Sequence, residues 1–302
     1  MPTPEDPRPD PENSERLADQ FEAHRAHLRA VAYRMLGSAS DAEDAVQESW
    51  FRLSRSDVSE IENLRAWLTT VVARVCLDML RARTSRREDS LDVHVPDPIV
   101  TRADSDPESN VIVADSVGLA LLVVLETLEP AERLAFVLHD VFGMTFDDIA
   151  PIVDRTPVAA RQLASRARRR VQGQTPASDA DVRNQRRVVD AFLAAAENGD
   201  FEGLLAVLDP AIVLRADAGA GKGLSRIVRG AQAVASQAAT FSQSGLTNHV
   251  VRVNGNIGVV ARRSDGRVFS ILGFTIAGDK IVQIDILADA ERISRLDLTA
   301  VS

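Results

Sequence analysis

The chain has 302 residues, a hydrophobic share of 45% and a formal net charge of −9 at pH 7. This length and apolar content are enough for more than one packed core, and the acidic balance excludes a protein that binds nucleic acid through overall positive charge. The longest apolar run, Val117 to Leu125, is far shorter than the ~20 residues of a membrane span. The single cysteine, Cys76, lies in an apolar helical pattern and excludes a disulfide framework. We therefore expect a cytoplasmic protein with no membrane partner.

Composition and periodicity divide the chain into helical, linking and mixed segments. The first residues are acidic and proline-rich, whereas a secretion signal would be basic and then apolar. Helical periodicity follows, is interrupted by a stretch rich in Ser, Asp and Pro, and finally gives way to β-branched runs separated by turn residues. The predicted segments are a disordered tail (1–16), a helical domain (17–83), a linker (84–110), a second helical domain (111–171), a linker (172–181) and an α+β domain (182–302).

The stretch SDAEDAVQESWFRL, Ser40 to Leu53, predicts an amphipathic helix with an unusual polar face. Its apolar stripe, at the i, i+3, i+4 spacing of a buried helix face, consists of Ala42, Ala45, Val46, Ser49, Trp50 and Leu53. The opposite face gathers Asp44, Gln47, Glu48 and Phe51. One interpretation is an ordinary solvated surface with one stray aromatic side chain. The alternative is a surface that a partner protein contacts.

Two helices joined by a short turn are predicted between Thr145 and Val171. Thr145 can cap the first helix with Asp148 three residues later, and Thr156 can cap the second, with Pro157 at the first helical position. Pro151 lacks a backbone N–H and is expected to kink the first helix or end it early. The pattern is typical of a helix-turn-helix.

The second of these helices concentrates arginine on its outward face. A recognition helix in the major groove contacts base edges with its early residues and phosphates with the later ones. The alternative is a solvated basic helix whose arginines interact with the negative end of the helix dipole. The candidate DNA-binding residues are Val158, Arg161, Gln162, Ser165, Arg166, Arg168 and Arg169.

These motifs, together with YRMLGSASDAEDAVQESWFRL (from Tyr33) and LRAWLTTVVARVCLDMLRAR (from Leu64), resemble the extracytoplasmic-function group of bacterial sigma factors over Phe21 to Val171. The resemblance implies two modules, for the −10 and −35 promoter elements, and two partners, promoter DNA and core RNA polymerase. On the polymerase it implies the coiled coil of the largest subunit and the β flap. The residues that it assigns to polymerase binding are Asp41, Asp44, Gln47, Glu48 and Phe51.

The same resemblance assigns a −10 site to the first helical domain. The polar stretch Ser54 to Asn63 would receive a flipped base beside a cationic track. Trp67 repeats with Val71 and Arg74, so a core position is as compatible with the pattern as a stacking one. The residues implied for −10 binding are Asn63, Arg65, Trp67, Arg74 and Arg81.

The last domain, with FLAAAENGDFEGLLAVLDPAIVLRAD from Phe192, resembles the cone-shaped NTF2-like fold, close to SnoaL polyketide cyclases. Sigma factors with this domain form a subgroup in which a proline-rich linker motif and a Gly-rich loop ending in Lys contribute to control. The subgroup's usual Asn-Pro-Asp-Lys near the end is replaced here by ADAERISRLDL, from Ala288. The implied regulatory residues are Pro96, Pro98, Asp217, Gly219, Gly221 and Lys222.

An enzymatic third domain is the competing interpretation. Asp217, His249, Arg262 and Asp285 lie in or near predicted strands, and a cavity carboxylate beside a histidine can act as acid or base. The sequence shows no triad, nucleotide-binding loop or metal-ligand spacing there. We therefore expect no catalysis, no cofactor and no metal, and we leave open a small-molecule ligand in the cavity.

The sequence thus predicts an alternative sigma factor modulated by its fused third domain. The fold class is multidomain, with two all-α domains followed by an α+β domain. Two alternatives remain: a ligand-sensing helix-turn-helix regulator, and an NTF2-like cyclase or hydrolase fused to a DNA-binding domain. The face around Asp44 favours the sigma factor, because an autonomous regulator has no need of a polymerase-binding surface.

Overall fold

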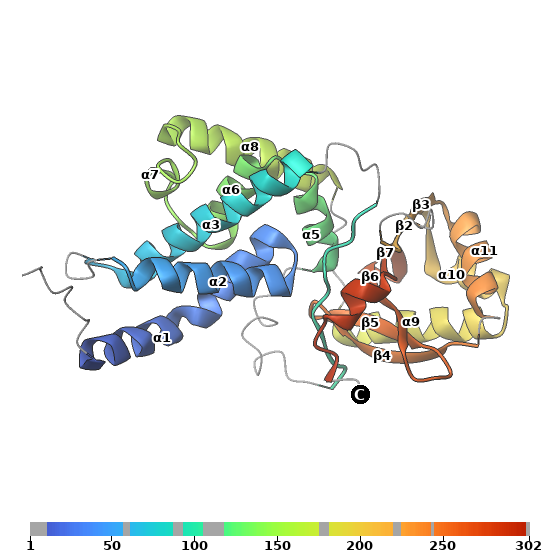
Figure 1. Ribbon diagram of the computed structural model, residues 1–302. Coiled ribbons are helices and arrows are strands. Elements are labelled where there is room, and N and C mark those ends of the chain that lie inside the picture. The colour runs from blue at the N-terminus through green and yellow to red at the C-terminus, as the bar shows by residue number, and fades with distance from the viewer. Residues whose placement is uncertain are drawn as a thin grey trace, which may run out of the picture.

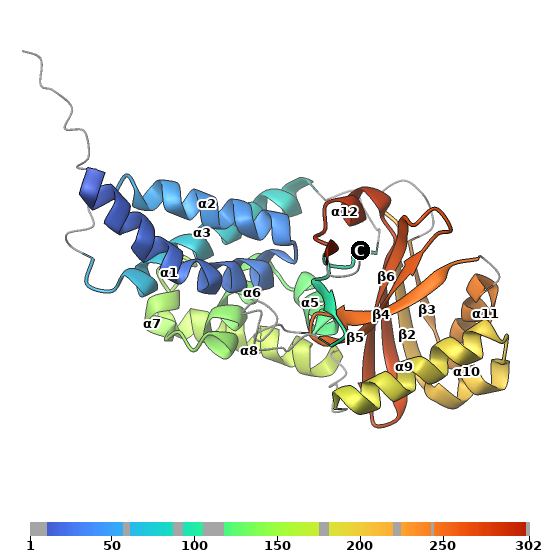
Figure 2. The ribbon, with the colours of Figure 1, turned by 90° about the horizontal axis from the view of Figure 1, so that it is seen from below.

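The computed structural model describes residues 11–56, 61–86, 93–104, 118–174, 181–219, 225–242 and 245–299. Two helical domains pack together at one end of the molecule, and a sheet flanked by helices forms the other end (Figures 1 and 2). The linker between the helical domains runs along the junction and joins the edge of the sheet. Within the described ranges, no helix is long and apolar enough to cross a membrane.

The first helical domain consists of α1 (Pro11–Leu36), α2 (Ala39–Leu53) and α3 (Leu64–Arg86). Gly37, at φ +69°, ends α1, and Ser38 caps α2 by accepting a hydrogen bond from the Asp41 amide. For residues 11–16 the predicted disordered tail is wrong, because α1 begins at Pro11. Proline is accepted in the first turn of a helix, where its missing N–H has no partner to lose.

The second helical domain consists of α5 (Leu119–Glu126), α6 (Pro130–Phe136), the π-helical turn η3 (Val137–Val141), α7 (Phe146–Ile149) and α8 (Pro157–Gln174). Both predicted caps form: the Asp148 amide donates to Thr145 Oγ1 at 3.2 Å, and the Ala159 amide to Thr156 Oγ1 at 3.3 Å. The early end of the first helix is confirmed, because α7 stops at Ile149, before Pro151.

The two helical domains share one apolar core. Leu28 and Leu68 from the first domain and Leu134, Leu138 and Ile149 from the second are fully buried in the same cluster. Cys76 is buried in this core too, and burial raises the pKa of its thiol, in agreement with a packing role.

Polar contacts cross the same boundary. Arg133 of α6 is buried and donates from Nε and Nη2 to the carbonyl of Arg34, at 3.3 and 3.2 Å, while its Nη1 pairs with Glu126 at 3.0 Å. The second domain thereby supplies a hydrogen-bond partner for a carbonyl in the last turn of α1, a group that a helix end leaves unpaired.

The third domain is built on a seven-stranded sheet of order β1-β4-β5-β6-β7-β2-β3. The strands are β1 (Val100–Arg102), β2 (Leu208–Asp217), β3 (Arg226–Arg229), β4 (Thr247–Val253), β5 (Asn256–Arg262), β6 (Val268–Ala277) and β7 (Lys280–Leu287). Its helices are α9 (Val182–Glu197), α10 (Phe201–Val207), α11 (Ala231–Ser242) and α12 (Ala290–Ser294). The predicted hairpins are confirmed, with β4, β5, β6 and β7 pairing antiparallel in sequence. Strand β1 was not predicted, because it comes from the linker and pairs with β4.

The two faces of the sheet have different partners. Helices α9, α10 and α11 cover one face, where Phe192, Leu204 and Val234 meet Val259 and Phe274 in an apolar core. The other face carries a second core, in which Val95 and Val100 of the linker, Leu119 of α5 and Ile293 of α12 pack on the strands. The sheet therefore contacts the linker and the second helical domain directly.

Candidate functional site

Helix α2 buries its predicted stripe and exposes the polar face. Ala42, Ala45, Val46, Ser49 and Leu53 are buried. Asp44, Gln47 and Glu48 are exposed, and Phe51 keeps 44% of its surface accessible. Asp41 is less exposed and pairs with Arg83 of α3, whereas Glu48 accepts from Arg52 of its own helix at 3.1 Å. An exposed phenyl ring among carboxylates has no partner among the described residues, so this face can contact a protein that offers cations and an apolar site.

The residues predicted for −10 binding lie along α3 but in different surroundings. Asn63 caps α3, because its Oδ1 accepts from the Ala66 amide at 3.1 Å. Trp67 is half-buried against the shared core. Arg65 and Arg81 are exposed, Arg81 within 4.0 Å of Asp78. The residues of the polar loop at 57–60 lie outside the described part of the chain.

Part of this α3 face is turned toward the second helical domain. Arg74 donates to the carbonyl of Pro151 at 3.3 Å, in the turn that follows α7. His27 lies within hydrogen-bonding distance of Arg65 and Thr69 and contacts the ring of Phe142, 5.4 Å between centroids. In this arrangement, therefore, the helix-turn-helix domain contacts part of the α3 face that carries the residues predicted for −10 binding.

Helix α8 presents the predicted outward face to solvent. The residues exposed on it are Val158, Arg161, Gln162, Ser165, Arg166 and Arg169. Arg168 is less accessible, and its Nε donates to Asp140 at 3.0 Å. Arg170 pairs with Glu132 at 2.9 Å. The guanidinium of Arg161 lies 5.3 Å from the ring centroid of Phe146 on α7. The result is an exposed basic surface on a capped helix.

The linker is held by a polar cluster that we call the linker clasp (His94, Val95, Asp97, Asp217 and Arg292). Arg292 of α12 donates to Asp97 at 2.8 Å, to Asp217 at 2.7 Å and to the Val95 carbonyl at 2.6 Å. Asp217 also accepts from the Val95 amide at 2.9 Å. Burial opposes ionisation of Asp217, but these donors, with His94 and the Gly219 amide, outweigh it and lower its pKa to about 2. The carboxylate is therefore charged at neutral pH and holds the linker on the sheet.

Four of the predicted regulatory residues lie in or beside the linker clasp. Pro96 and Pro98 are buried on either side of Asp97. Gly219, at φ +83°, leaves no room for a side chain, because an added Cβ would lie 2.4 Å from an Asp289 carboxylate oxygen. Gly221 and Lys222 fall outside the described residues.

A second contact ties the third domain to the first helical domain. At the tip of the β4–β5 hairpin, Asn254 donates from Nδ2 to the Tyr33 hydroxyl at 2.9 Å and accepts from the Ile99 amide at 3.1 Å. Tyr33 in turn donates to the Asp97 carbonyl at 2.7 Å. Sequence reasoning found neither Asn254 as a contact nor Arg292, although the Asn-Gly dipeptide marked the turn. Only the partner positions, which are distant in sequence, reveal their role.

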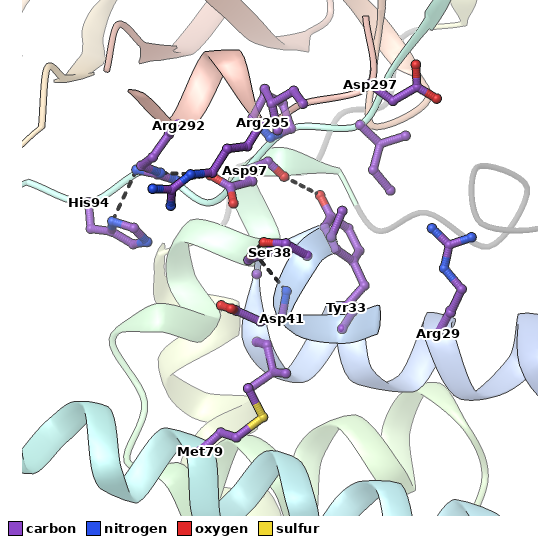
Figure 3. Close-up of a pocket in the computed structure, with 18 of the residues that line it drawn as sticks. Arg29, Tyr33, Ser38, Asp41, Met79, His94, Asp97, Arg292, Arg295 and Asp297 are labelled. Carbon is purple, nitrogen blue, oxygen red and sulfur yellow. Dashed lines mark hydrogen bonds and ion pairs between the residues drawn. The ribbon is translucent and has the colours of Figure 1, made fainter. Parts of the chain in front are cut away.

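A cleft of about 990 Å³ lies at this three-way junction (Figure 3). Its walls come from the ends of α1 and α3, the start of α2, the linker and the segment around α12. Arg292, Arg295 and His94 lie on one side in Figure 3, with Ser38, Asp41 and Met79 across from them. Asp41 and Asp97 pair with arginines of the same walls, Arg83 and Arg292.

The polar residues considered for catalysis in the third domain do not converge. Asp217 belongs to the linker clasp. Asp285 is buried beside Arg215, at 3.4 Å, and Gln283, at 2.6 Å, and burial raises the pKa of its carboxyl. His249 is exposed on β4. Within the described chain, no three His, Cys, Asp or Glu side chains gather as a metal site would require.

Comparisons with known proteins agree with this architecture. The family model for sigma-70 region 2 matches residues 20–86, and that for sigma-70 region 4 matches residues 118–171. The extracytoplasmic-function RNA polymerase sigma factor SigJ of Mycobacterium tuberculosis is 42% identical over 219 residues, which cover 71% of this chain and 70% of that protein. The probable sigma factor SigI of the same species is 42% identical over 204 residues, covering 67% and 70%.

The crystal structure of Mycobacterium tuberculosis SigJ has the same architecture. It superposes with a TM-score of 0.74 at 33% identity and covers 93% of this chain and 100% of that chain. The predicted fold class is confirmed, with region 2 and region 4 as the two helical domains and an α+β domain after them. The chain therefore belongs to the extracytoplasmic-function sigma factors, as an alternative sigma factor that directs core RNA polymerase to promoters.

Proposed function

We propose that the chain contacts polymerase and promoter through three separate helix faces. The α2 face (Asp44, Gln47, Glu48, Phe51), with Asp41 at its edge, binds the coiled coil of the largest subunit. The α3 residues around Trp67 meet the −10 strand. The α8 face enters the major groove at the −35 element, with region 4 held against the β flap. In support, α2 and α8 expose surfaces of opposite charge.

The exposed face of α8 carries this proposal. Val158, Arg161 and Gln162 occupy its amino-terminal half, which a helix-turn-helix places against base edges, whereas Arg166 and Arg169 lie further along, where phosphates pass. Arg168 already pairs with Asp140 and contributes less than its neighbours in this arrangement. The chain's net acidity of −9 confines attraction for DNA to such local surfaces.

The two ends of α8 can be tested separately in the reconstituted holoenzyme. Arg161→Ala is expected to relax the preference at one −35 position, because a bidentate arginine–guanine pair contributes about 1–3 kcal/mol of discrimination. Arg169→Ala is expected to weaken all sequences alike and to flatten the dependence of affinity on salt. Arg183→Ala, an exposed arginine on α9, is the control and should change neither. Equal, sequence-blind losses in both α8 variants would rule out α8 as the reader.

The third domain, we propose, regulates and does not catalyse. The linker clasp fixes the segment between regions 2 and 4, and Leu119 of region 4 packs on the same sheet. A domain that touches both DNA-binding modules and the linker can favour one of their arrangements over another. The candidate acid–base residues are engaged in different places, which supports a non-enzymatic role. A small-molecule effector would act by binding one of these arrangements better than the other.

A further inference from the structure

Two aromatic rings lie beneath the start of α8. Phe146, the first residue of α7, is half-buried against the shared core, and the guanidinium carbon of Arg161 is 5.3 Å from its ring centroid. The ring of His139 stacks on Phe146, with 3.9 Å between centroids and 29° between planes. His139 Nδ1 is 2.9 Å from the carbonyl oxygen of Met144. The Thr145 cap thus holds the start of α7 in place, and the core and His139 flank the phenyl ring.

We propose that Phe146 is a positioning residue that holds Arg161 ready to read one base of the −35 element. The inference rests on the proposed function, because it assumes that α8 enters the major groove. What it adds is a residue that touches no DNA and yet determines how sharply the helix discriminates among bases.

The geometry distinguishes Arg161 from Arg168 and Arg170 on the same helix. The planar guanidinium of arginine can lie over an aromatic face. The N–H groups lie in the plane of the group, so its edge stays available for the O6 and N7 atoms of a guanine. A carboxylate occupies that edge instead, as Asp140 does for Arg168 and Glu132 for Arg170. Contact with the Phe146 ring therefore restrains Arg161 without placing a carboxylate on its N–H groups.

Holding the side chain in advance also lowers the entropy lost on binding. Arginine has a long side chain with many rotamers, and immobilising it at an interface opposes association. Part of this ordering is already done by the ring in the free protein. This entropic benefit counts only where the guanidinium of Arg161 pairs with its base. Loss of the Phe146 ring should therefore reduce discrimination among −35 sequences more than overall affinity for DNA.

The test uses holoenzyme reconstituted from core polymerase and the full chain, with promoter DNA randomised across the −35 element. Base preferences are compared for wild type, F146L, F146Y, R161A and the double variant F146L/R161A. Leucine keeps an apolar side chain in the core but has no π face, whereas tyrosine keeps the ring. F146L is expected to lower the preference at the Arg161-dependent position by roughly two- to tenfold, the effect of disordering one long side chain. F146Y should keep it, and F146L should change nothing further in the R161A background.

The outcomes separate the two proposals. If R161A alters no position, α8 is not the reader, and both proposals are lost. If R161A removes a preference that F146L leaves intact, only the role of Phe146 is overturned. It is also overturned if F146Y loses as much as F146L, or if F146L acts equally with and without Arg161, because the ring would then serve folding alone.

A measurement on the free full-length chain covers the case in which F146L fails to fold. The Nε–H proton of Arg161, assigned by its loss in R161K, should show the ring-current shift of a group above a phenyl ring. F146Y should retain that shift. Its absence in the wild type would mean that the stack does not form in solution, and the proposal would be withdrawn.

Discussion

Asn254 joins three parts of the chain with one side chain. It is 1% exposed and has φ +49°, a left-handed conformation that asparagine tolerates better than most residues. The side-chain oxygen of Asn254 accepts from the Ile99 amide of the linker, and its side-chain nitrogen donates to the Tyr33 hydroxyl of region 2. The backbone N–H of Asn254 donates to the Ile99 carbonyl at 2.9 Å. The side-chain oxygen, the side-chain nitrogen and the backbone N–H of Asn254 are thus all used at a boundary between domains.

Asn254→Gly should lower the free energy of unfolding by about 1–3 kcal/mol, because the Ile99 amide stays in a partly buried place without its acceptor. Glycine also adopts a left-handed backbone, so the loss of stability measures the contribution of the side-chain amide group. Asp154→Gly is the matched control, since Asp154 is also left-handed, at φ +56°, but exposed. Thermal unfolding and hydrogen exchange at Ile99 measure the effect. Equal stability of the two variants would show that Asn254 is only a turn residue.

Among the secondary-structure elements, helix α2 is determined by its own residues, whereas strand β1 depends on a partner strand. Helix α2 forms from its own signals: a Ser38 cap, an acidic first turn and an apolar stripe. Strand β1 has three residues and no alternating pattern, and it exists because β4 offers an edge to which it can pair, from Val100 opposite Val253 to Arg102 opposite Val251. A strand of this length has no stability of its own. It therefore depends on the third domain.

The exposed face of α2 makes a prediction about polymerase binding. Asp44→Ala combined with Phe51→Ala should abolish co-purification with core polymerase and leave the helical circular dichroism unchanged, because neither side chain is buried. A matched control exists on α10, where Glu202 and the 37% exposed Phe201 again pair an acid with an exposed phenyl ring. Their double alanine variant should bind like wild type. Undiminished association of the α2 variant would contradict the proposed face.

At the scale of the whole molecule, region 2, the linker and region 4 all contact the sheet of the third domain. Region 2 reaches it through Tyr33, the linker through Val95 and Val100, and region 4 through Leu119. Gly273 on β6 makes room for Leu119, whose Cδ2 lies 2.9 Å from the place where a Cβ would be. Removing the sheet therefore affects all three parts at once.

Truncation after Gly173 tests this view. Val95, Val100 and Leu119, which are 0%, 6% and 5% exposed, lose their cover, and the linker loses the Asp217 and Arg292 contacts. We expect run-off transcription to change strongly and trypsin to cut at Arg102 faster than in the full chain. Asp217→Asn in the full chain should reproduce part of both changes. If the truncated protein transcribes at the full-length rate from the same promoter, the third domain is not a regulator.

The sequence by itself determined the features that depend on neighbours along the chain. The α2 stripe, the caps at Thr145 and Thr156, the early end of α7 before Pro151 and the hairpin at Asn254 are all local effects of spacing and backbone chemistry. Regions 2 and 4 were likewise identified from motifs that each lie within one continuous stretch of the chain. These features could be predicted because each residue's partner lies within a few positions.

Only the tertiary structure decided which distant groups meet. No periodicity pairs Arg292 with Asp97, Tyr33 with Asn254 or Phe146 with Arg161. The same chain segments could have been packed in another order with their local patterns intact. Hydrogen bonds and ring contacts between residues so far apart depend on how whole elements pack, and that is a property of the assembled cores.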